Sequence, residues 1–304
     1  MIAAGLIASR FLHYLALSVL FGGAVFPLYG FVHWRPGKQP VPPWLLGLMR
    51  ASALLALLSG IAWFAFTTAG MSGSMEGVAD PSVLSIVILN TDFGRVWAVR
   101  LGLAAALILP LASRRIAAPR YYAVLVGSLL LLGSIAFTGH AGADDTRAGL
   151  PHRLLDMFHL AAAGIWIGAL VILARMVTVA LRELRRDDLT LLHHALKQFS
   201  GIGTAVVATL ILTGVFNPGF LAGFSTLYGQ VLLTKLVLFG AMLLLAAANR
   251  FWLTPRLASA LQSYGDLEVP MRMLWASVFV ETALAGFVLL AVGWLGTLSP
   301  TARG

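Results

Sequence analysis

The chain has 304 residues, of which 59% are hydrophobic and 11% charged, and its mean hydropathy is +0.89. A soluble domain carries about twice that share of charge, so a soluble fold is excluded and lipid is the expected solvent. The formal charge of +9 does not indicate nucleic-acid binding, because the basic residues fall in short stretches between apolar segments. The absence of cysteine excludes disulfides and thiolate metal sites, which leaves histidine, methionine and oxygen as available metal ligands.

Eight segments are long and apolar enough to cross a bilayer, which takes about 20 residues. In chain order they are Ile2 to Phe31, Trp44 to Ala69, Phe93 to Ser113, Tyr121 to Thr138, Leu154 to Ala180, Phe199 to Leu221, Gln230 to Leu253, and Met273 to Leu298. The first lacks the pattern of a cleavable signal peptide, because its apolar stretch carries Arg10 and His13. The connections are short, so we predict one membrane domain over residues 1–304, an all-α polytopic protein with about eight transmembrane helices.

The odd-numbered connections between the predicted spans differ in charge from the even-numbered connections. The odd connections carry most of the basic residues, among them Arg35, Lys38, Arg114, Arg115, Arg120, Arg182, Arg185, Arg186 and Arg256. The second and fourth connections carry the acidic residues Glu76, Asp80, Asp144 and Asp145, with Arg147 as the one basic exception, and the sixth connection carries no charge. Because cytoplasmic loops are enriched in lysine and arginine, we predict a multi-pass inner-membrane protein with both termini in the periplasm.

The chain also contains an internal repeat. Residues 91–101 and 226–236 both read T-x-[FY]-G-x-V-x-x-x-[RK]-L, at the starts of the third and seventh segments. His13 matches His159 in the first and fifth segments, and Ser59-Gly60 falls like Thr213-Gly214 in the second and sixth. Four segments per unit preserve direction through the membrane, so we predict two parallel four-helix repeats, over 1–139 and 154–298.

Four of the seven histidines fall in the predicted outer half, namely His13, His140, His152 and His159. His13 and His159 are predicted one to two turns inside the membrane, where an imidazole is costly unless it faces the bundle interior or finds a partner. His152, Asp156 and His159 share one helical face, because they are separated by four and three residues. Asp156 either orients a neighbouring histidine, as carboxylates do in metal sites, or pairs with Arg10. The alternative is a helix cap with interfacial polar residues and no metal.

Two methionines suggest which metal such histidines would bind. Met71 and Met75 lie in the predicted outer connection that follows the second segment. Thioether sulfur selects Cu(I), whereas imidazole accepts Cu(I) or Cu(II). With no thiolate present, histidine and methionine together are the ligands expected for copper outside the cytoplasm.

Three further charged residues lie within the predicted spans. Arg100 and Lys235 occupy matched positions of the repeat, where they either pair with polar groups or extend toward the membrane surface. Glu281 is the one carboxylate deep within a span, nearer the cytoplasmic side, and it is either a relay point for ions or protons or a structural partner. No hydrolase triad, P-loop or dinucleotide fingerprint is present, so we do not expect an enzyme.

Several motifs resemble the CopD family of copper-resistance proteins. They are Phe137-Thr138-Gly139-His140-Ala141, the pattern H-x-x-A-x-x-x-W-x-G from His159 to Gly168, and Phe93-Gly94-Arg95-Val96-Trp97. The resemblance covers most of the chain and implies eight spans and copper movement across the bacterial inner membrane, inward from the periplasm. It implies that His140 and His159 are copper ligands, with His13 a candidate through the repeat. The partners expected are the lipid bilayer and a periplasmic copper-binding protein.

Two alternatives to copper transport remain open at this stage. One is an electron carrier, in which His13 with His159, or His140 with His159, would clamp a b-type haem between spans. The other is a copper sensor or receptor that binds the metal and hands it to a partner without translocating it.

Overall fold

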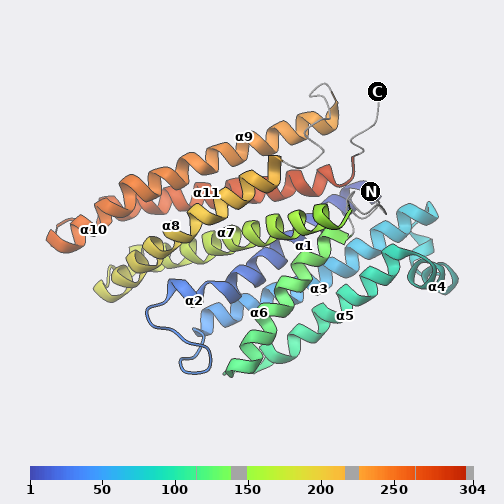
Figure 1. Cartoon of the computed structure of the whole chain (residues 1–304), viewed down its shortest axis with the longest axis horizontal. Coiled ribbons are helices and arrows are strands. Elements are labelled where there is room, and N and C mark those ends of the chain that lie inside the picture. Colours follow the sequence, from blue (N-terminus) through green and yellow to red (C-terminus); the bar gives the residue numbers. More distant parts are fainter. Residues whose placement is uncertain (114, 138–148, 216–225, 264, 299–304) are drawn as a thin grey trace.

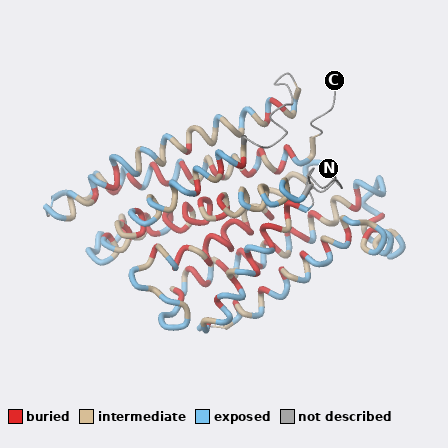
Figure 2. Tube along the Cα trace, viewed as in Figure 1, coloured by how far each residue is buried: buried red, intermediate tan, exposed pale blue. Residues whose placement is uncertain are grey.

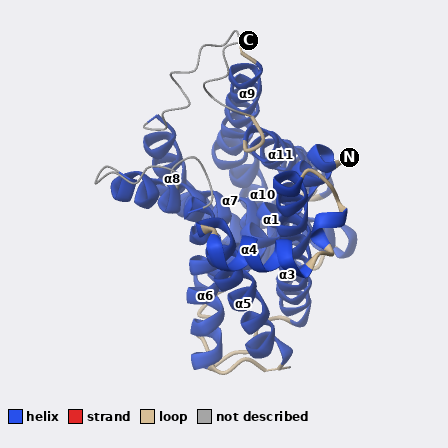
Figure 3. Ribbon diagram, turned by 90° about the vertical axis from the view of Figure 1, so that its right-hand side faces the viewer, coloured by secondary structure: helices blue, strands red, loops and turns tan. Residues whose placement is uncertain are grey.

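The computed structural model describes residues 1–113, 115–137, 149–215, 226–263 and 265–298, and within these ranges it contains helices and no strand (Figures 1 and 3). The elements are α1 (Ile2–Val25), α2 (Pro27–Gly30), α3 (Pro43–Ser72), η1 (Glu76–Val78), α4 (Pro81–Asn90), α5 (Asp92–Ala112), α6 (Ala118–Gly133), η2 (Ser134–Phe137), α7 (Gly149–Glu183), α8 (Arg186–Val215), α9 (Leu227–Ala248), η5 (Asn249–Leu253), α10 (Thr254–Ser263) and α11 (Glu268–Leu295).

The described helices include eight that are long and apolar enough to cross a membrane, as predicted. The structure adds the short helix α4 in the second connection, which the sequence analysis treated as loop. It also starts α8 at Arg186, well before the predicted Phe199, because Leu189, Leu192 and Ala195 form a buried face on an otherwise polar stretch. His193 and His194 therefore lie on a helix and not in a loop.

The repeated T-x-[FY]-G motif has a clear structural role at the start of two helices. The Thr91 hydroxyl accepts a hydrogen bond from the backbone N–H of Gly94 at 2.9 Å, and this caps α5. The Thr226 hydroxyl accepts the equivalent bond from Gly229 at 3.1 Å and caps α9. An N-terminal cap satisfies a donor that the helix leaves unpaired, so the motif fixes where each helix begins.

Helices α1 and α7 form the centre of the bundle. In the apolar 18-residue stretch of each of these two spans, 67% is buried, against 11% in the span that contains α9. Figure 2 shows the buried positions along the middle of the molecule. The helices α3, α5 and α6 lie on one side of this pair, and α8, α9 and α11 on the other (Figure 1). The first residues of α1 and α7 and the helix α4 share one end of the bundle, at the right in Figure 1, which we call the predicted outer end.

Small residues allow α1 and α7 to approach closely. A Cβ atom on Gly22 would lie 2.6 Å from both the Gly164 carbonyl oxygen and Gly168 Cα. A Cβ atom on Gly168 would lie 2.6 Å from Gly22 Cα and 2.9 Å from the Ser18 carbonyl oxygen. Gly22 and Gly168 are separated by the same number of residues as Ser18 and Gly164, so each pair occupies equivalent positions of the two repeats. The contacts are therefore reciprocal, as they would be around a two-fold axis along the bundle. They support the proposal of two parallel repeats.

Candidate metal site

His13 is fully buried in α1, where it faces α3. Its Nδ1 lies 3.0 Å from the carbonyl oxygen of Ala56 and 3.2 Å from the hydroxyl of Ser59. A carbonyl oxygen only accepts, so Nδ1 carries the proton and donates it. The neutral ring then presents its lone pair at Nε2, which is buried without a hydrogen-bond partner. His13 is therefore held with one nitrogen free to bind a metal.

His159 is held in the same way in the second half. Its Nδ1 lies 2.8 Å from the Thr213 hydroxyl on α8. That hydroxyl donates its own proton to the Thr209 carbonyl oxygen at 2.6 Å, so it accepts from Nδ1–H of His159. Metal-binding histidines usually donate the non-ligating N–H to such an oxygen, which fixes the tautomer and the orientation of the ring.

The oxygen acceptors of the two histidines are evident only in the structure. Ser59 and Thr213 were noted only as part of the repeat, yet each contacts the histidine of its own half. The signal was the recurrence of a hydroxyl residue followed by glycine at matched positions, together with a histidine at matched positions.

The surroundings of His13 are aromatic and positively charged. Its ring centroid lies 5.6 Å from that of Trp63 and 5.8 Å from that of Trp97. The guanidinium carbon of Arg100 lies 4.4 Å from the Trp97 ring centroid, and that of Arg10 lies 5.0 Å from the Trp63 ring centroid. Arg100 is only 1% exposed and donates to the hydroxyl and carbonyl oxygens of Ser134, at 2.9 and 2.6 Å.

The surroundings of His159 contain charges of both signs. Asp156 precedes His159 by one turn, and the titratable side chains close enough to act electrostatically on its carboxyl are His152 and Lys235. Lys235 also acts electrostatically on His159. Among the ion pairs of the described residues, none joins Asp156 to Arg10, so this alternative pairing from the sequence finds no support. The second half thus has a carboxylate close to its histidine.

The described part of the chain shows no cluster formed by the remaining predicted histidine ligands. Among the residues that the structure describes, no group of three or more histidine or acidic side chains is placed to hold one metal ion. His152 has a buried Nε2 without a partner, whereas His140 lies outside the described residues. Met71 and Met75 are 55% and 45% exposed at the predicted outer end, Met71 near the end of α3 and Met75 just before η1.

Glu281 lies in a separate polar contact between α7, α11 and the π-helical turn η5. The side chain is 1% exposed, Oε1 accepts from Trp166 Nε1 at 3.0 Å, and Oε2 accepts from Asn249 Nδ2 at 2.9 Å. The sequence analysis did not anticipate either partner. Two neutral donors satisfy the carboxylate, so it is hydrogen-bonded in place, and π-helical turns are frequent at functional sites.

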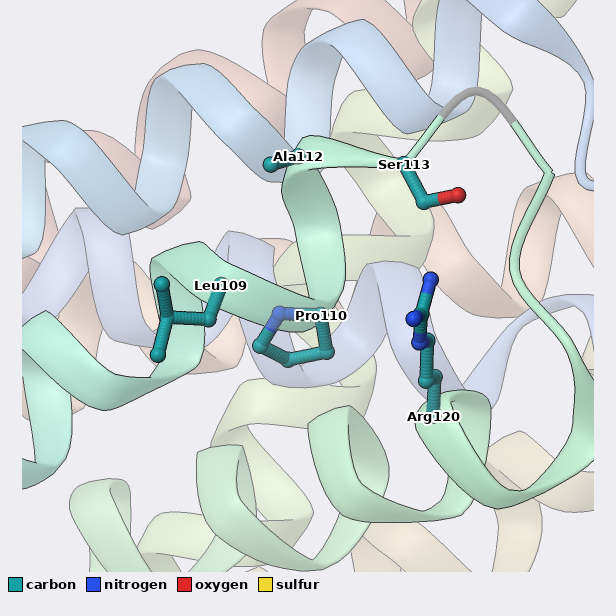
Figure 4. Close-up of a pocket in the computed structure, with 5 residues that line it drawn as sticks. All are labelled: Leu109, Pro110, Ala112, Ser113 and Arg120. Carbon is teal, nitrogen blue, oxygen red and sulfur yellow. The ribbon is translucent and has the colours of Figure 1, made fainter.

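A surface pocket at the C-terminal end of α5 is separate from the surroundings of His13. Figure 4 shows that it is lined by Leu109, Pro110, Ala112, Ser113 and Arg120. Trp97, which contacts the ring of His13, is 13 residues before Pro110, or about 20 Å along the helix. The pocket contains none of the predicted ligands.

Comparisons with known proteins agree on one family. Residues 1–150 match the family model for the copper resistance protein D-like N-terminal domain, and residues 193–295 match the model for copper resistance protein D. Copper resistance protein D of Pseudomonas syringae pv. tomato is 33% identical, over 97% of this chain and 96% of its own length. Inner membrane protein YebZ of Escherichia coli is 28% identical, over 99% of this chain and its whole length. Copper transport protein CutJ of Bacillus subtilis is 30% identical, over 81% of this chain and 46% of its own length. No solved structure matches the chain.

Proposed function

Because the chain belongs to the copper resistance protein D family, we propose that it carries copper across the inner membrane from the periplasm toward the cytoplasm. The similarity to an inner membrane protein and to a copper transport protein supports both the location and the cargo. The inward direction is the one that the family resemblance implies, and the charge distribution predicts only that the end carrying Met71 and Met75 faces the periplasm.

The observation that carries this proposal is the matched hydrogen bonding of two histidines, of which His13 is fully buried and His159 is partly buried. His13 and His159 each donate Nδ1–H to an oxygen and leave Nε2 as the nitrogen for a metal. At His13 this Nε2 is buried without a hydrogen-bond partner, which is costly inside a membrane bundle, and a bound metal would offset that cost. His140 and His152 are proposed as further ligands.

Copper would meet the exposed thioethers of Met71 and Met75 first, and a periplasmic copper-binding protein would deliver it there. Thioether sulfur selects Cu(I) and imidazole also binds it, so the two kinds of ligand can hold the same ion in succession. Asp156 and Lys235 would then set the charge beside His159. Arg10 and Arg100 would set the charge beside His13. Glu281 lies further along the bundle.

Copper flux into proteoliposomes tests this proposal. We expect His13→Ala and His159→Ala each to lower the initial rate by at least about tenfold, the loss typical when a metal site is disrupted. His194→Ala, near the opposite end of the bundle, is the matched control and should transport like the unmodified protein. Unchanged flux in the double variant would contradict the assignment of the two histidines. Tight copper binding without flux in the unmodified protein would favour a sensor or receptor.

A further inference from the structure

A group of buried hydrogen-bond donors surrounds Trp63 on α3. Its ring centroid lies 5.0 Å from that of Trp97 on α5 and 5.6 Å from that of His13 on α1. The guanidinium carbons of Arg10 and Arg100 lie 5.0 and 5.9 Å from the same Trp63 centroid. Two positive charges and two indole rings therefore meet beside the ring of His13.

Most of these donors have no acceptor. Nε and Nη1 of Arg10, Nε1 of Trp63 and Nε1 of Trp97 are buried and have no hydrogen-bond partner. Indole and guanidinium nitrogens only donate, so these groups cannot satisfy one another. Arg10 also forms no ion pair with a described carboxylate. Leaving several donors and a positive charge unpaired in a membrane bundle is costly, so the arrangement calls for a negatively charged acceptor.

We propose that Arg10, Trp63 and Trp97 form a binding site for a small inorganic anion of the halide class, directly beside His13. Water fits the site less well, because a water molecule brings no negative charge to offset the guanidinium groups. The site is also too enclosed for a lipid headgroup, since Trp63 is 3% exposed and Trp97 and His13 are both 0% exposed.

Comparison of the two halves indicates a role for this anion, if the proposed copper function holds. The repeat places Asp156 at the position equivalent to Arg10, three residues before the histidine in each half. A copper ion at His159 has this carboxylate one turn away, whereas a copper ion at His13 would face two guanidinium groups. The anion supplies the negative charge that Asp156 supplies in the second half and that Arg10 does not supply in the first, so copper at His13 carries an anionic co-ligand.

Bromide is the probe for the anion site, because it scatters anomalously and needs no copper. Crystals grown in bromide should show an anomalous peak between Arg10 and the two indole rings. In solution the thermal midpoint should be higher in chloride than in gluconate at equal ionic strength, because an anion that binds the folded state stabilises it. Arg10→Met should lose both effects, and the matched control Arg95→Met, an exposed arginine on α5, should keep them.

If Arg10→Met does not fold, Trp97→Phe gives the same test, because it keeps the ring and the charges and removes one donor. It should weaken the chloride effect by at least about tenfold in apparent affinity. No bromide peak at this position, together with equal thermal midpoints in chloride and gluconate, would overturn the anion site.

A separate measurement tests the link to copper. X-ray absorption of copper-loaded protein in bromide should show bromine as a neighbour of copper, and Arg10→Met should lose this signal. A bromide peak in the crystal without bromine at the copper ion would keep the anion site and overturn the co-ligand role. A bromide peak in a protein that does not bind copper would keep the anion site and overturn the proposed function.

Discussion

Replacing Thr213 with valine removes the acceptor that holds His159 while leaving the shape of the side chain almost unchanged. In the native structure Nδ1–H of His159 donates to the Thr213 hydroxyl at 2.8 Å. In Thr213→Val the proton loses its acceptor, so it is no longer held on Nδ1, and Nε2 is no longer fixed as the ligating nitrogen. Loss of a group that orients a ligating histidine typically weakens metal binding by about 10- to 100-fold, or about 1.4 to 2.8 kcal/mol.

Competition of the purified protein with a copper chelator measures this loss. A His13→Ala background isolates the second half. Thr213→Ser restores the acceptor and should recover most of the affinity. Thr209→Val lies one turn away on the same helix and serves as the matched control, because the Thr209 hydroxyl bonds only to the backbone of its own helix. Native affinity in Thr213→Val would refute the reasoning that the Thr213 hydroxyl positions the ligand.

Three further predictions concern packing, the buried carboxylate and capture of copper. Gly22→Ala places a methyl group against the α7 backbone and should lower the free energy of unfolding by about 1–3 kcal/mol. In the control Gly47→Ala the added methyl group meets no atom within 4 Å, so this variant should lose no stability. Equal stability of the two variants would contradict the close approach of α1 and α7. Glu281→Leu leaves two buried donors unpaired and should cost about 1–3 kcal/mol for each. Glu281→Gln keeps an acceptor and should lose less, so equal losses in the two variants, measured by the same unfolding assay, would disprove this account of the contact. Met71→Leu combined with Met75→Leu should leave stability within about 0.5 kcal/mol, because both side chains are exposed, and should slow copper uptake at low external copper; superimposable uptake curves would exclude capture by these thioethers.

The transmembrane helices were predictable because apolar length alone decides which segments span a bilayer. The helical extensions were not, because they depend on one buried face within a polar stretch. Leu189 and Leu192 of α8 illustrate this, since their burial is visible only once the neighbouring helices are in place. The short helix α4 was not predicted because its 10 residues are too few to span a bilayer, so the apolar length that identifies the spans does not identify it.

The candidate site was predictable as a set of residue types but not as a geometry. The repeat related His13 to His159, and the cost of an imidazole in lipid marked both as functional candidates. The hydrogen bonds to Ala56 and Thr213 were not accessible, because they join helices whose rotation about their own axes the sequence does not fix. For the same reason the sequence alone does not show that the N–H of Trp166 donates to Glu281.

The central claim is that copper binds at Nε2 of the two matched histidines. Crystals of the copper-loaded protein, measured with anomalous scattering at the copper edge, test it most directly. The account predicts an anomalous peak within bonding distance of Nε2 of His13, of His159 or of both. Copper peaks confined to surface residues, with none at either imidazole, would contradict it.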